Sequence, residues 1–353
     1  MNPTDRRTGV DTLRIAGIVV AVALLLVCLS RVDLQLVSAH LVARGPILLL
    51  AWVPFLLAAL LDIQAFRIVG KLLGERLGFA ATATAHVAGE AVAMSLPLGV
   101  IFSESLRTYL ATQLGSARGP AMVAATAARK YLLISSEGIS VGLGAALGGA
   151  LLGRTSTALF GTPILLWLAW GIAALLLVLA AGYAVLVRGG SVAQRCFDLA
   201  RRLAGQRFAP RVERLHSAFI QTDLELKHLF EAPPGQLVLP SAMYLGVWLL
   251  EAAETYVALR LLGADVPWQA VLCIESLLSF VRAIASVLPA GLGVQDLGYA
   301  LLLQGMGVSD SANVGAAFCV LKRAKEILWM LTGYGAWLGA PSVAHRARAA
   351  LAS

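Results

Sequence analysis

The sequence predicts an all-α polytopic membrane protein, with about six full spans plus two re-entrant helical hairpins in an inverted-topology repeat. Of its 353 residues, 59% are hydrophobic and only 14% are charged, and the mean hydropathy is +0.80. Soluble domains average about 25% charged residues. Many of the apolar residues gather in runs of about 20, the length that crosses a bilayer. This composition excludes a soluble enzyme, a disordered chain and a disulfide scaffold.

Six apolar segments predict full spans, because a helix satisfies its own backbone hydrogen bonds in lipid. They are residues 14–30, 46–68, 119–150, 158–187, 236–261 and 310–340. The first follows Arg6 and Arg7 and is not followed by an A-x-A-like cleavage site. We therefore expect an uncleaved helix rather than a signal peptide. The whole chain, 1–353, is expected to form a single integral membrane domain.

Two further apolar segments, 80–115 and 267–306, are interrupted by proline and glycine. The part after each interruption has only about 10–12 residues, too few to cross about 30 Å at 1.5 Å per residue. Such lengths indicate re-entrant helical hairpins, and two proline-kinked spans are the alternative. The predicted hairpin tips are Pro97, Gly99, Pro289, Gly291 and Gly293.

The longest polar stretch, residues 188–235, is rich in arginine. Because loops rich in Lys and Arg stay inside, we predict a basic cytoplasmic loop. Its apolar positions indicate an amphipathic helix on the membrane surface, with a solvated linker as the alternative. Counting spans from this loop places both chain termini in the cytoplasm. The same count places Arg67, Lys71 and Arg76 on the cytoplasmic side, which agrees with their charge.

Residues 46–150 and 236–340 are predicted to be two copies of one unit. Each contains a Leu-Pro-x-Gly break, a later glycine and a later arginine at nearly constant spacing. By the span count, the first unit begins with an inward-running helix and the second with an outward-running one. This is the inverted repeat of many secondary transporters. A chance similarity between two kinked helices is the alternative.

Charged side chains at membrane depth are costly, so they are candidates for a functional site. The candidate substrate-binding residues are Arg129, Lys130, Arg323, Lys322, Glu90, Arg282, Glu104, Arg107, Gln295 and Asp296. Arginine suits phosphate because its planar fork donates two hydrogen bonds. Glu90 and Arg282 hold equivalent positions before the two breaks, which would allow them to pair. The alternative is internal ion pairing that locks helices together, and we favour it for Asp62, Glu251 and Glu254.

The sequence predicts no cofactor, no metal site and no catalytic residues. The four cysteines form no CxxC pair, and the five histidines form no HExxH motif. No glycine-rich nucleotide-binding loop is present, and the acidic residues form no recognisable catalytic set. We read the positive charge as membrane orientation rather than nucleic-acid binding. We therefore do not expect an enzyme.

The motif around the second break resembles that of a known family. Residues 288–296, followed by Gly307 and Lys322-Arg323, look like the Pro-x-Gly-x-Gly-(Val)-x-Glu pattern of the lysylphosphatidylglycerol synthase transmembrane-region (flippase-like) family. The residues that look like its upstream counterpart are Pro97, Gly99, Glu104, Arg107 and Arg129. The resemblance covers most of the chain, from about residue 10 to about residue 340.

The resemblance implies the lipid-flipping part of this family rather than lipid aminoacylation, without the soluble aminoacyl-transfer domain. The Gly-Val-Gln run is also similar to that of the hopanoid-associated members. Gln295-Asp296 departs from the family pattern, because the acid that commonly follows the glycines is shorter by one methylene group.

Together these features predict a lipid flippase of the bacterial inner (cytoplasmic) membrane. The polar headgroup, expected to bear phosphate, of a membrane phospholipid or isoprenoid lipid would cross through a midplane cavity between the two hairpins. The tails would stay in the lipid. A small-solute secondary transporter is the first alternative, and a lipid-modifying membrane enzyme is the second.

Overall fold

The computed structural model describes residues 35, 38, 42–96, 99–203, 213–233, 235–284, 294–308 and 311–352. The side chains of residues 203, 280, 282–284, 294–296 and 341–352 are not among the described groups. The predicted first span, 14–30, therefore lies outside the described part. So do the predicted hairpin-tip residues Pro97, Pro289, Gly291 and Gly293, and the side chains of the candidate residues Arg282, Gln295 and Asp296.

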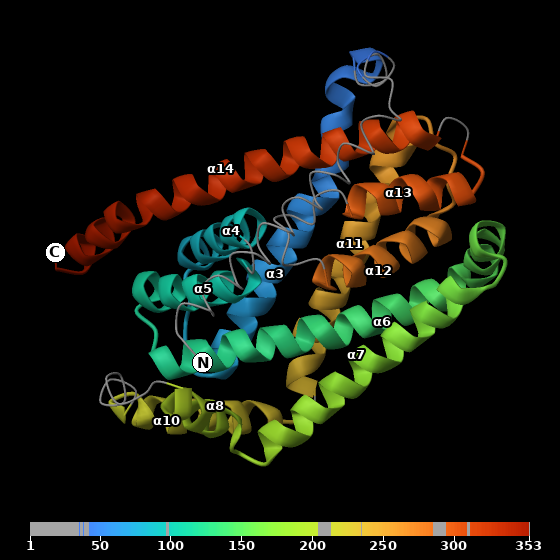
Figure 1. Cartoon of the computed structure of the whole chain (residues 1–353). Helices are drawn as coiled ribbons and strands as arrows, with labels where there is room; N and C mark the ends of the chain where they lie inside the picture. Colours follow the sequence, from blue (N-terminus) through green and yellow to red (C-terminus); the bar gives the residue numbers. More distant parts are fainter. Residues whose placement is uncertain are drawn as a thin grey trace, which may run out of the picture.

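Every regular element in the described part is a helix, which confirms the all-α fold class (Figure 1). The elements are η1 (Gly45–Ala51), α3 (Trp52–Leu72), α4 (Phe79–Ser95), α5 (Gly99–Gly115), α6 (Gly119–Phe160), α7 (Ile164–Arg188), α8 (Val192–Leu203), α10 (His216–Glu231), α11 (Gly235–Leu261), α12 (Trp268–Ile284), α13 (Val294–Gly305) and α14 (Ser311–Ala352).

Within these residues, four helices are long and apolar enough to cross a membrane. They are Val42–Leu72, which includes η1 and α3, and the helices α6, α7 and α11. They coincide with four of the six predicted spans. The predicted span at 310–340 is helical as part of α14, but α14 is not one of the four. Its apolar sequence is interrupted by the charged residues Lys322, Arg323, Lys325 and Glu326.

The turn between α6 and α7 lies later than the sequence predicts. Helix α6 continues to Phe160, and α7 begins only at Ile164. The helix ends at Gly161, which takes the left-handed conformation that glycine tolerates (φ 74°). The hydroxyl of Ser156 donates to the Thr162 carbonyl oxygen (2.7 Å) and accepts from the Leu165 backbone N–H (3.0 Å). These bonds hold the turn closed.

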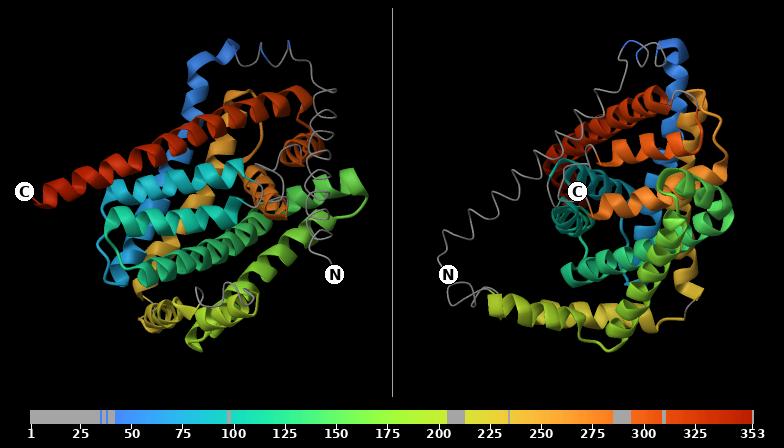
Figure 2. Two further views of the ribbon diagram at one scale, coloured as in Figure 1. Left: turned by 60° about the vertical axis from the view of Figure 1, so that its left-hand side comes forward. Right: turned by 45° about the vertical axis from the view of Figure 1, so that its right-hand side comes forward.

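The helices are arranged around a central pair, α3 and α11, which pack against each other. On one side of this pair the long helix α14 lies across α4, and on the other side the long helix α6 lies along α12 (Figures 1 and 2). Small residues allow these close crossings. A Cβ atom on Gly333 of α14 would lie 2.4 Å from the Val87 carbonyl oxygen, and one on Gly148 of α6 would lie 2.6 Å from that of Gln269.

The two predicted units have the same order of helices. In the first, α3 has 21 residues, α4 and α5 have 17 each, and α6 has 42. In the second, α11 has 27, α12 has 17, α13 has 12 and α14 has 42. The packing also corresponds, because α4 contacts α14 while α12 contacts α6. Exchanging the two units maps the contact of α4 with α14 onto that of α12 with α6, and the contact of α3 with α11 onto itself.

The α4–α5 and α12–α13 hairpins have their ends against opposite parts of α6. At the first hairpin, Arg118 next to the start of α6 donates to the Leu73 carbonyl oxygen (2.8 Å). At the second, Gln269 and Gly305 lie against Gly148 and Thr155 in the C-terminal part of α6. Each hairpin thus begins and ends on one side of the bundle, and the two sides differ.

Helix α5 is longer than the 10–12 residues that the sequence predicts after the interruption, because it begins as early as Gly99. Its 17 residues extend about 25 Å. The early start depends on glycine, since a Cβ at position 99 would lie 2.4 Å from the Val92 carbonyl oxygen and 2.7 Å from that of Ala93. Helix α13, with 12 residues, has the predicted length.

In the described part of the polar stretch 188–235, the helices α8 and α10 pack on each other. The Asp223 carboxylate accepts the backbone N–H groups of Ala193 and Gln194 (2.7 and 2.9 Å) at the start of α8. Helix α10 packs in turn on α6 and α7. The described part of this stretch is therefore a folded helical layer rather than a linker. Whether it lies on a membrane surface stays a prediction.

Arg118 connects α10 to the turn after α3. Its guanidinium bonds both Glu75 and Glu225 at 2.6 Å. The hydrogen bond to Glu75, together with the charge of Glu225, raises the pKa of Arg118 above its ordinary value. The turn after α3 and the helix α10 thus lie on the same side of the bundle, as the predicted topology requires.

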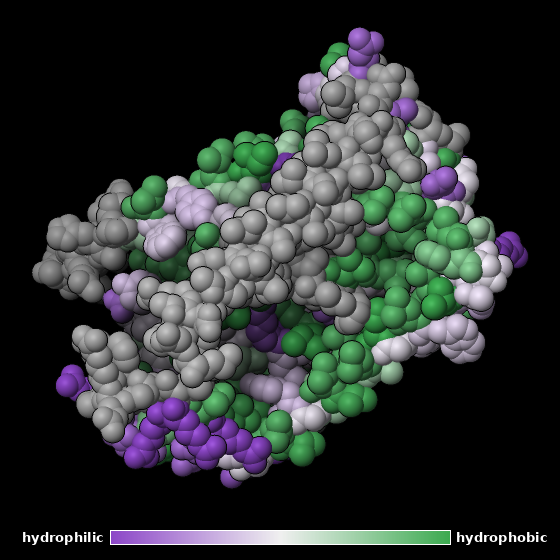
Figure 3. All heavy atoms as spheres, in the orientation of Figure 1, coloured by the Kyte–Doolittle hydropathy of each residue, from purple (hydrophilic) through white to green (hydrophobic). Residues whose placement is uncertain are grey.

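The surface of the molecule separates apolar from polar side chains. In Figure 3 hydrophilic residues gather over α8 and α10 at the bottom, and hydrophobic residues cover much of the right-hand side. Helix α7 exposes large apolar side chains along its length, including Trp167, Val178 and Val185, each more than two-thirds exposed. Such an apolar outer surface is typical of a helix that faces lipid.

Candidate functional site

Charged and polar side chains from five helices meet inside the first unit and its contact with α11. We call this group the first cluster. It consists of Asp62 on α3, His86 and Glu90 on α4, Glu104 and Arg107 on α5, Arg129 and Lys130 on α6, and Tyr244 on α11. The sequence analysis named five of these as candidate site residues, and the structure brings all five together: Glu90, Glu104, Arg107, Arg129 and Lys130.

Arg129 is paired with Asp62 through two hydrogen bonds. Its Nε donates to Asp62 Oδ1 at 2.8 Å, and a terminal nitrogen donates to Oδ2. The other terminal nitrogen donates to Glu104 Oε1 at 3.1 Å. Both Arg129 and Asp62 are buried. A buried bidentate pair of this kind fixes α6 against α3 and, through Glu104, against α5.

Arg107 is the second buried arginine and is surrounded by three carboxylates. It donates to Glu90 Oε1 at 2.9 Å and lies 3.8 Å from both Asp62 Oδ1 and Glu104 Oε2. Glu90 was expected to be able to pair with Arg282. In the structure it pairs with Arg107, because α4 and α5 pack side by side. The pairing with Arg282 stays a prediction, since that side chain lies outside the described groups.

The first cluster reaches solvent-accessible space at one edge. Lys130 is 37% exposed and its Nζ lies 2.7 Å from Glu104 Oε1, while Glu90 is 30% exposed. The arginines behind them are 2–3% exposed. The cluster therefore has a buried interior of arginine and aspartate and an accessible edge formed by Lys130 and Glu90.

Among the residues that the structure describes, three inaccessible polar atoms of the first cluster have no hydrogen-bond partner. They are Glu104 Oε2, Arg107 Nε and the Tyr244 hydroxyl. The Tyr244 hydroxyl interacts electrostatically with Asp62 and Arg129, and also with Glu104 and Arg107. A buried polar group without a partner costs roughly 1–3 kcal/mol. The ion pairs alone therefore do not satisfy this cluster.

A second group of polar side chains lies inside the second unit. This second cluster consists of Glu254 and Thr255 on α11, Glu275 on α12, Tyr299 on α13, and Lys322 and Lys325 on α14. Glu275 accepts hydrogen bonds from both Thr255 and Tyr299. Lys322 donates to the Tyr299 hydroxyl at 2.8 Å. Of the predicted site residues whose side chains the structure describes, Lys322 belongs to this cluster.

Lys325 occupies in the second unit the role that Arg129 has in the first. It forms a buried ion pair with Glu254 of α11, as Arg129 does with Asp62 of α3. Its Nζ also lies 4.0 Å from the centre of the Phe55 ring, a cation–π contact. Arg323, which the sequence pattern matches to Arg129, instead bonds Glu326 on its own helix at 2.6 Å.

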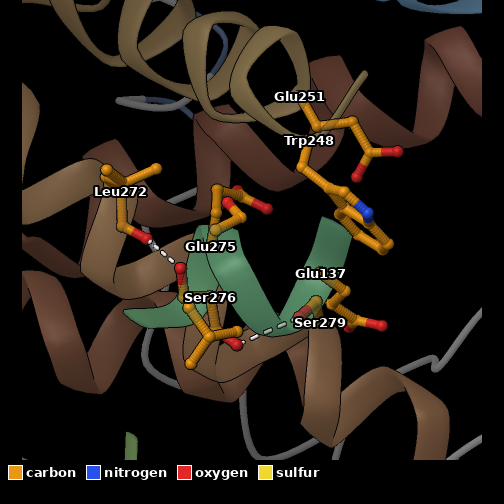
Figure 4. A pocket seen from close by; sticks show the side chains of 9 residues that line it. Glu137, Trp248, Glu251, Leu272, Glu275, Ser276 and Ser279 are labelled. Carbon is orange, nitrogen blue, oxygen red and sulfur yellow. Dashed lines mark hydrogen bonds between the residues drawn. The ribbon is translucent and has the colours of Figure 1, made fainter. Parts of the chain in front are cut away.

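Glu275 also lines a small polar pocket between α6, α11 and α12. Figure 4 shows that Glu137, Trp248, Glu251 and Glu275 come from these three helices and surround the opening. Ser276 and Ser279 complete its α12 side, and they donate to the backbone oxygens of Leu272 and Ser276. In the described part, no group of three His, Cys, Asp or Glu residues is placed to hold a metal ion.

The sequence analysis did not select several residues that the structure places in the two clusters: His86, Tyr244, Thr255, Glu275, Tyr299 and Lys325. It interpreted Asp62 and Glu254 as structural, and each is indeed ion-paired. One signal in the sequence could have identified some of these residues. Polar residues near the middle of long apolar segments are costly, and this applies to His86 as much as to the acids.

Comparison with known protein families gives one result. The family model described as the lysylphosphatidylglycerol synthase TM region matches residues 14–332. Among curated proteins and among solved structures, none matches the chain.

Proposed function

Because the chain belongs to the lysylphosphatidylglycerol synthase transmembrane-region family, we propose that it is a lipid flippase. It moves a lipid with a polar, phosphate-bearing headgroup between leaflets, and the first cluster binds the headgroup. The family assignment supports a lipid-related function in a multi-pass membrane protein. The polar groups buried inside the bundle support a path for the headgroup.

The observation that carries this proposal is the unsatisfied state of the first cluster. A purely structural lock is expected to pair all its buried groups. Here Arg107 Nε remains as a donor and Glu104 Oε2 as an acceptor, with the Tyr244 hydroxyl close to the same charges. A headgroup hydroxyl can accept from the first and donate to the second. A headgroup oxygen therefore completes the hydrogen bonding of this cluster.

The accessible edge of the first cluster gives the headgroup a way in. Lys130 and Glu90 are the most exposed members, and each is paired with a more deeply buried partner. A phosphate that takes Lys130 as its partner releases Glu104 from one of its bonds. Arg129 and Asp62 keep the helices in place while these outer contacts change. They are positioning residues, and Lys130, Glu104 and Arg107 are the binding residues.

The two units support an alternating path. We propose that they form an inverted repeat, with the α4–α5 and α12–α13 hairpins re-entering from opposite sides of the bacterial inner membrane and both termini in the cytoplasm. The matching helix order and exchanged contacts of α4 with α14 and α12 with α6 support this arrangement. Transport through such repeats proceeds by rocking one unit against the other. The proposal thus describes a transporter rather than an enzyme.

A small-solute transporter is the second candidate, and the pocket between α6, α11 and α12 favours it. This pocket is lined by serine and glutamate side chains and lies beside the second cluster. The space it encloses is about 10 Å³, room for one water molecule, so a small cationic solute would enter only as the helices separate, and the acidic lining would favour it over a lipid headgroup with its tails. Uptake of radiolabelled amines and amino acids into proteoliposomes separates this candidate from lipid transport.

Reconstitution into liposomes tests the flippase proposal. The liposomes carry headgroup-labelled anionic, zwitterionic or isoprenoid lipids, and protection from an external quencher reports their movement. We expect the protein to accelerate exchange of at least one phosphate-bearing lipid. Lys130→Gln should lower this rate about tenfold, because a hydrogen bond to a charged group contributes roughly 1.5–3 kcal/mol.

The matched control is Lys227→Gln, which removes an exposed lysine paired with Glu231 on α10. Its rate should stay within twofold of the unmodified protein. No acceleration for any of the lipids would exclude the function. Equal rates for both lysine variants would exclude the first cluster as the binding site.

A further inference from the structure

One histidine lies inside the first cluster between a cation and an anion. His86 Nδ1 is 3.3 Å from a terminal nitrogen of Arg107 and 3.7 Å from Asp62 Oδ2. The side chain is 7% exposed. Histidine is the side chain whose ordinary titration falls nearest to physiological pH. The headgroup-binding role described above does not use it.

The protonation state of His86 decides which of its two neighbours it can bond. In the neutral form, Nδ1 can accept a hydrogen bond from Arg107, with the ring proton on Nε2. In the protonated form, Nδ1 carries a proton and repels Arg107, and it can donate to Asp62 instead. A proton on His86 therefore weakens the hold of the cluster on Arg107.

The charges of the first cluster balance when His86 is neutral. Three carboxylates, Asp62, Glu90 and Glu104, face three cations, Arg107, Arg129 and Lys130. A phosphate diester would add one uncompensated negative charge at membrane depth, which is costly. One proton bound at the same time restores the balance.

We propose that His86 is a proton-binding site coupled to the cargo, so that a phosphate-bearing headgroup and one proton cross together. This inference rests on the flippase function proposed above. The headgroup draws Arg107 away from His86, which frees Nδ1 and adds negative charge next to it. Both changes favour the proton, and by linkage the proton favours the headgroup to the same extent.

The charged groups that face His86 come from each helix around it. Asp62 of α3, Glu90 of α4, Arg107 of α5 and Arg129 of α6 interact with it electrostatically. Helix α14 also packs on α4, where Tyr334 bonds Ser95 near the end of α4. In the free protein the two arginines oppose protonation and the two carboxylates favour it. An anionic headgroup changes this balance toward the proton.

Flipping under a pH gradient tests the coupling. Proteoliposomes carry labelled phosphatidylglycerol or labelled phosphatidylcholine, and the pH is set equal or one unit lower on the side of the donor leaflet. Transfer of the anionic lipid should rise by up to about tenfold per pH unit, the limit for one coupled proton. Transfer of phosphatidylcholine, which carries its own cation, should respond less.

His86→Gln should make the rate for the anionic lipid independent of the gradient, since glutamine cannot take up the proton. The control His228→Gln changes an exposed histidine on α10 and should respond as the unmodified protein does. A gradient response that persists in His86→Gln, or that disappears only in Glu104→Gln, overturns the proposal.

A second measurement does not depend on flipping. A variant in which His40, His216, His228 and His345 are replaced by glutamine keeps His86 as the sole histidine, and its ring is titrated by NMR in nanodiscs. The midpoint should lie higher in phosphatidylglycerol than in phosphatidylcholine by at least half a pH unit. An unchanged midpoint overturns the proposal. If no lipid is flipped, the flippase function fails, while this titration still decides whether proton and anionic headgroup are linked.

Discussion

The first and second clusters use the same framework with different side chains. In each unit an acid on the first long helix pairs with a cation on the last one, Asp62 with Arg129 and Glu254 with Lys325. The first cluster contains two buried arginines and a histidine. The second relies on lysines that rest on aromatic rings, as Lys325 does on Phe55.

This difference indicates a binding role for the first cluster and a structural role for the second. Arginine can serve several partners at once, because its five donors lie in a fixed plane. Arg107 contacts Glu90 and His86, and its Nε has no hydrogen-bond partner among the described residues. Lys325 has its charge satisfied by Glu254 and Phe55. The first cluster is therefore suited to exchange partners with a headgroup, while the Glu254–Lys325 pair is suited to hold α11 and α14 together.

The largest expected effect is the loss of the first interhelical pair. Arg129→Met leaves Asp62 without its main partner in a buried site and removes one of the hydrogen bonds to Glu104. Breaking a buried pair in this way costs about 3–5 kcal/mol in the free energy of unfolding. Lys325→Met should cost less, because it removes a partner from one carboxylate rather than two. Thermal unfolding of the purified variants in detergent compares them.

The double variant Asp62→Asn/Arg129→Met is the control for this comparison. It removes both charges, so it should recover a large part of the stability lost in Arg129→Met. A double variant as unstable as the sum of its single changes would show that Asp62 and Arg129 act independently. If Lys325→Met lost more stability than Arg129→Met, the buried pair of the second cluster would contribute more to folding than that of the first.

A smaller effect is expected from alanine in place of glycine in the two hairpins. Gly99→Ala places a Cβ against backbone oxygens of α4, which move only with the helix. Such overpacking costs about 1–3 kcal/mol. Gly298→Ala in α13 meets the end of the Leu278 side chain at 2.5 Å, which can rotate away. We expect the first change to lower the unfolding temperature and the second to lower it less.

Flipping assays on the same two variants sharpen this comparison, because Gly99 begins α5, the helix that carries Glu104 and Arg107. Gly99→Ala should slow transport more than its loss of stability explains. The comparison fails if both alanine variants have equal stability and equal rates.

The helical fold class, four of the spans and the broken segments could be predicted from hydropathy and from the positions of proline and glycine. Helix ends were less predictable. The start of α5 at Gly99 depends on contact with α4. Helix α6 continues through the polar residues Arg154 and Thr155, where the sequence predicts a turn, and ends only at Gly161. Apolar periodicity carries no information about these tertiary contacts.

The candidate site was predictable where charge alone marked it. Arg129, Lys130, Glu104, Arg107 and Glu90 were expected to lie at membrane depth and do lie together. The partners of these residues could not be predicted, because pairing depends on how α3, α4, α5 and α6 pack. The repeat pattern matches Arg323 to Arg129, yet the ion pair with α11 that corresponds to Asp62–Arg129 is formed by Lys325, two residues further along α14.

The most direct test of the account compares two glutamates with similar surroundings. Glu104 in the first cluster and Glu326 on α14 each accept from an arginine and are 17% and 12% exposed. Of these two glutamates, within the described part of the chain, Glu104 alone also has a buried oxygen without a hydrogen-bond partner. The measurement is the flipping rate of a phosphate-bearing lipid in proteoliposomes for Glu104→Gln and Glu326→Gln. We predict at least a tenfold loss for the first, since roughly 1.5–3 kcal/mol of binding is removed, and less than a twofold change for the second. Equal losses in both variants, or a loss in Glu326→Gln alone, would contradict a headgroup site in the first cluster.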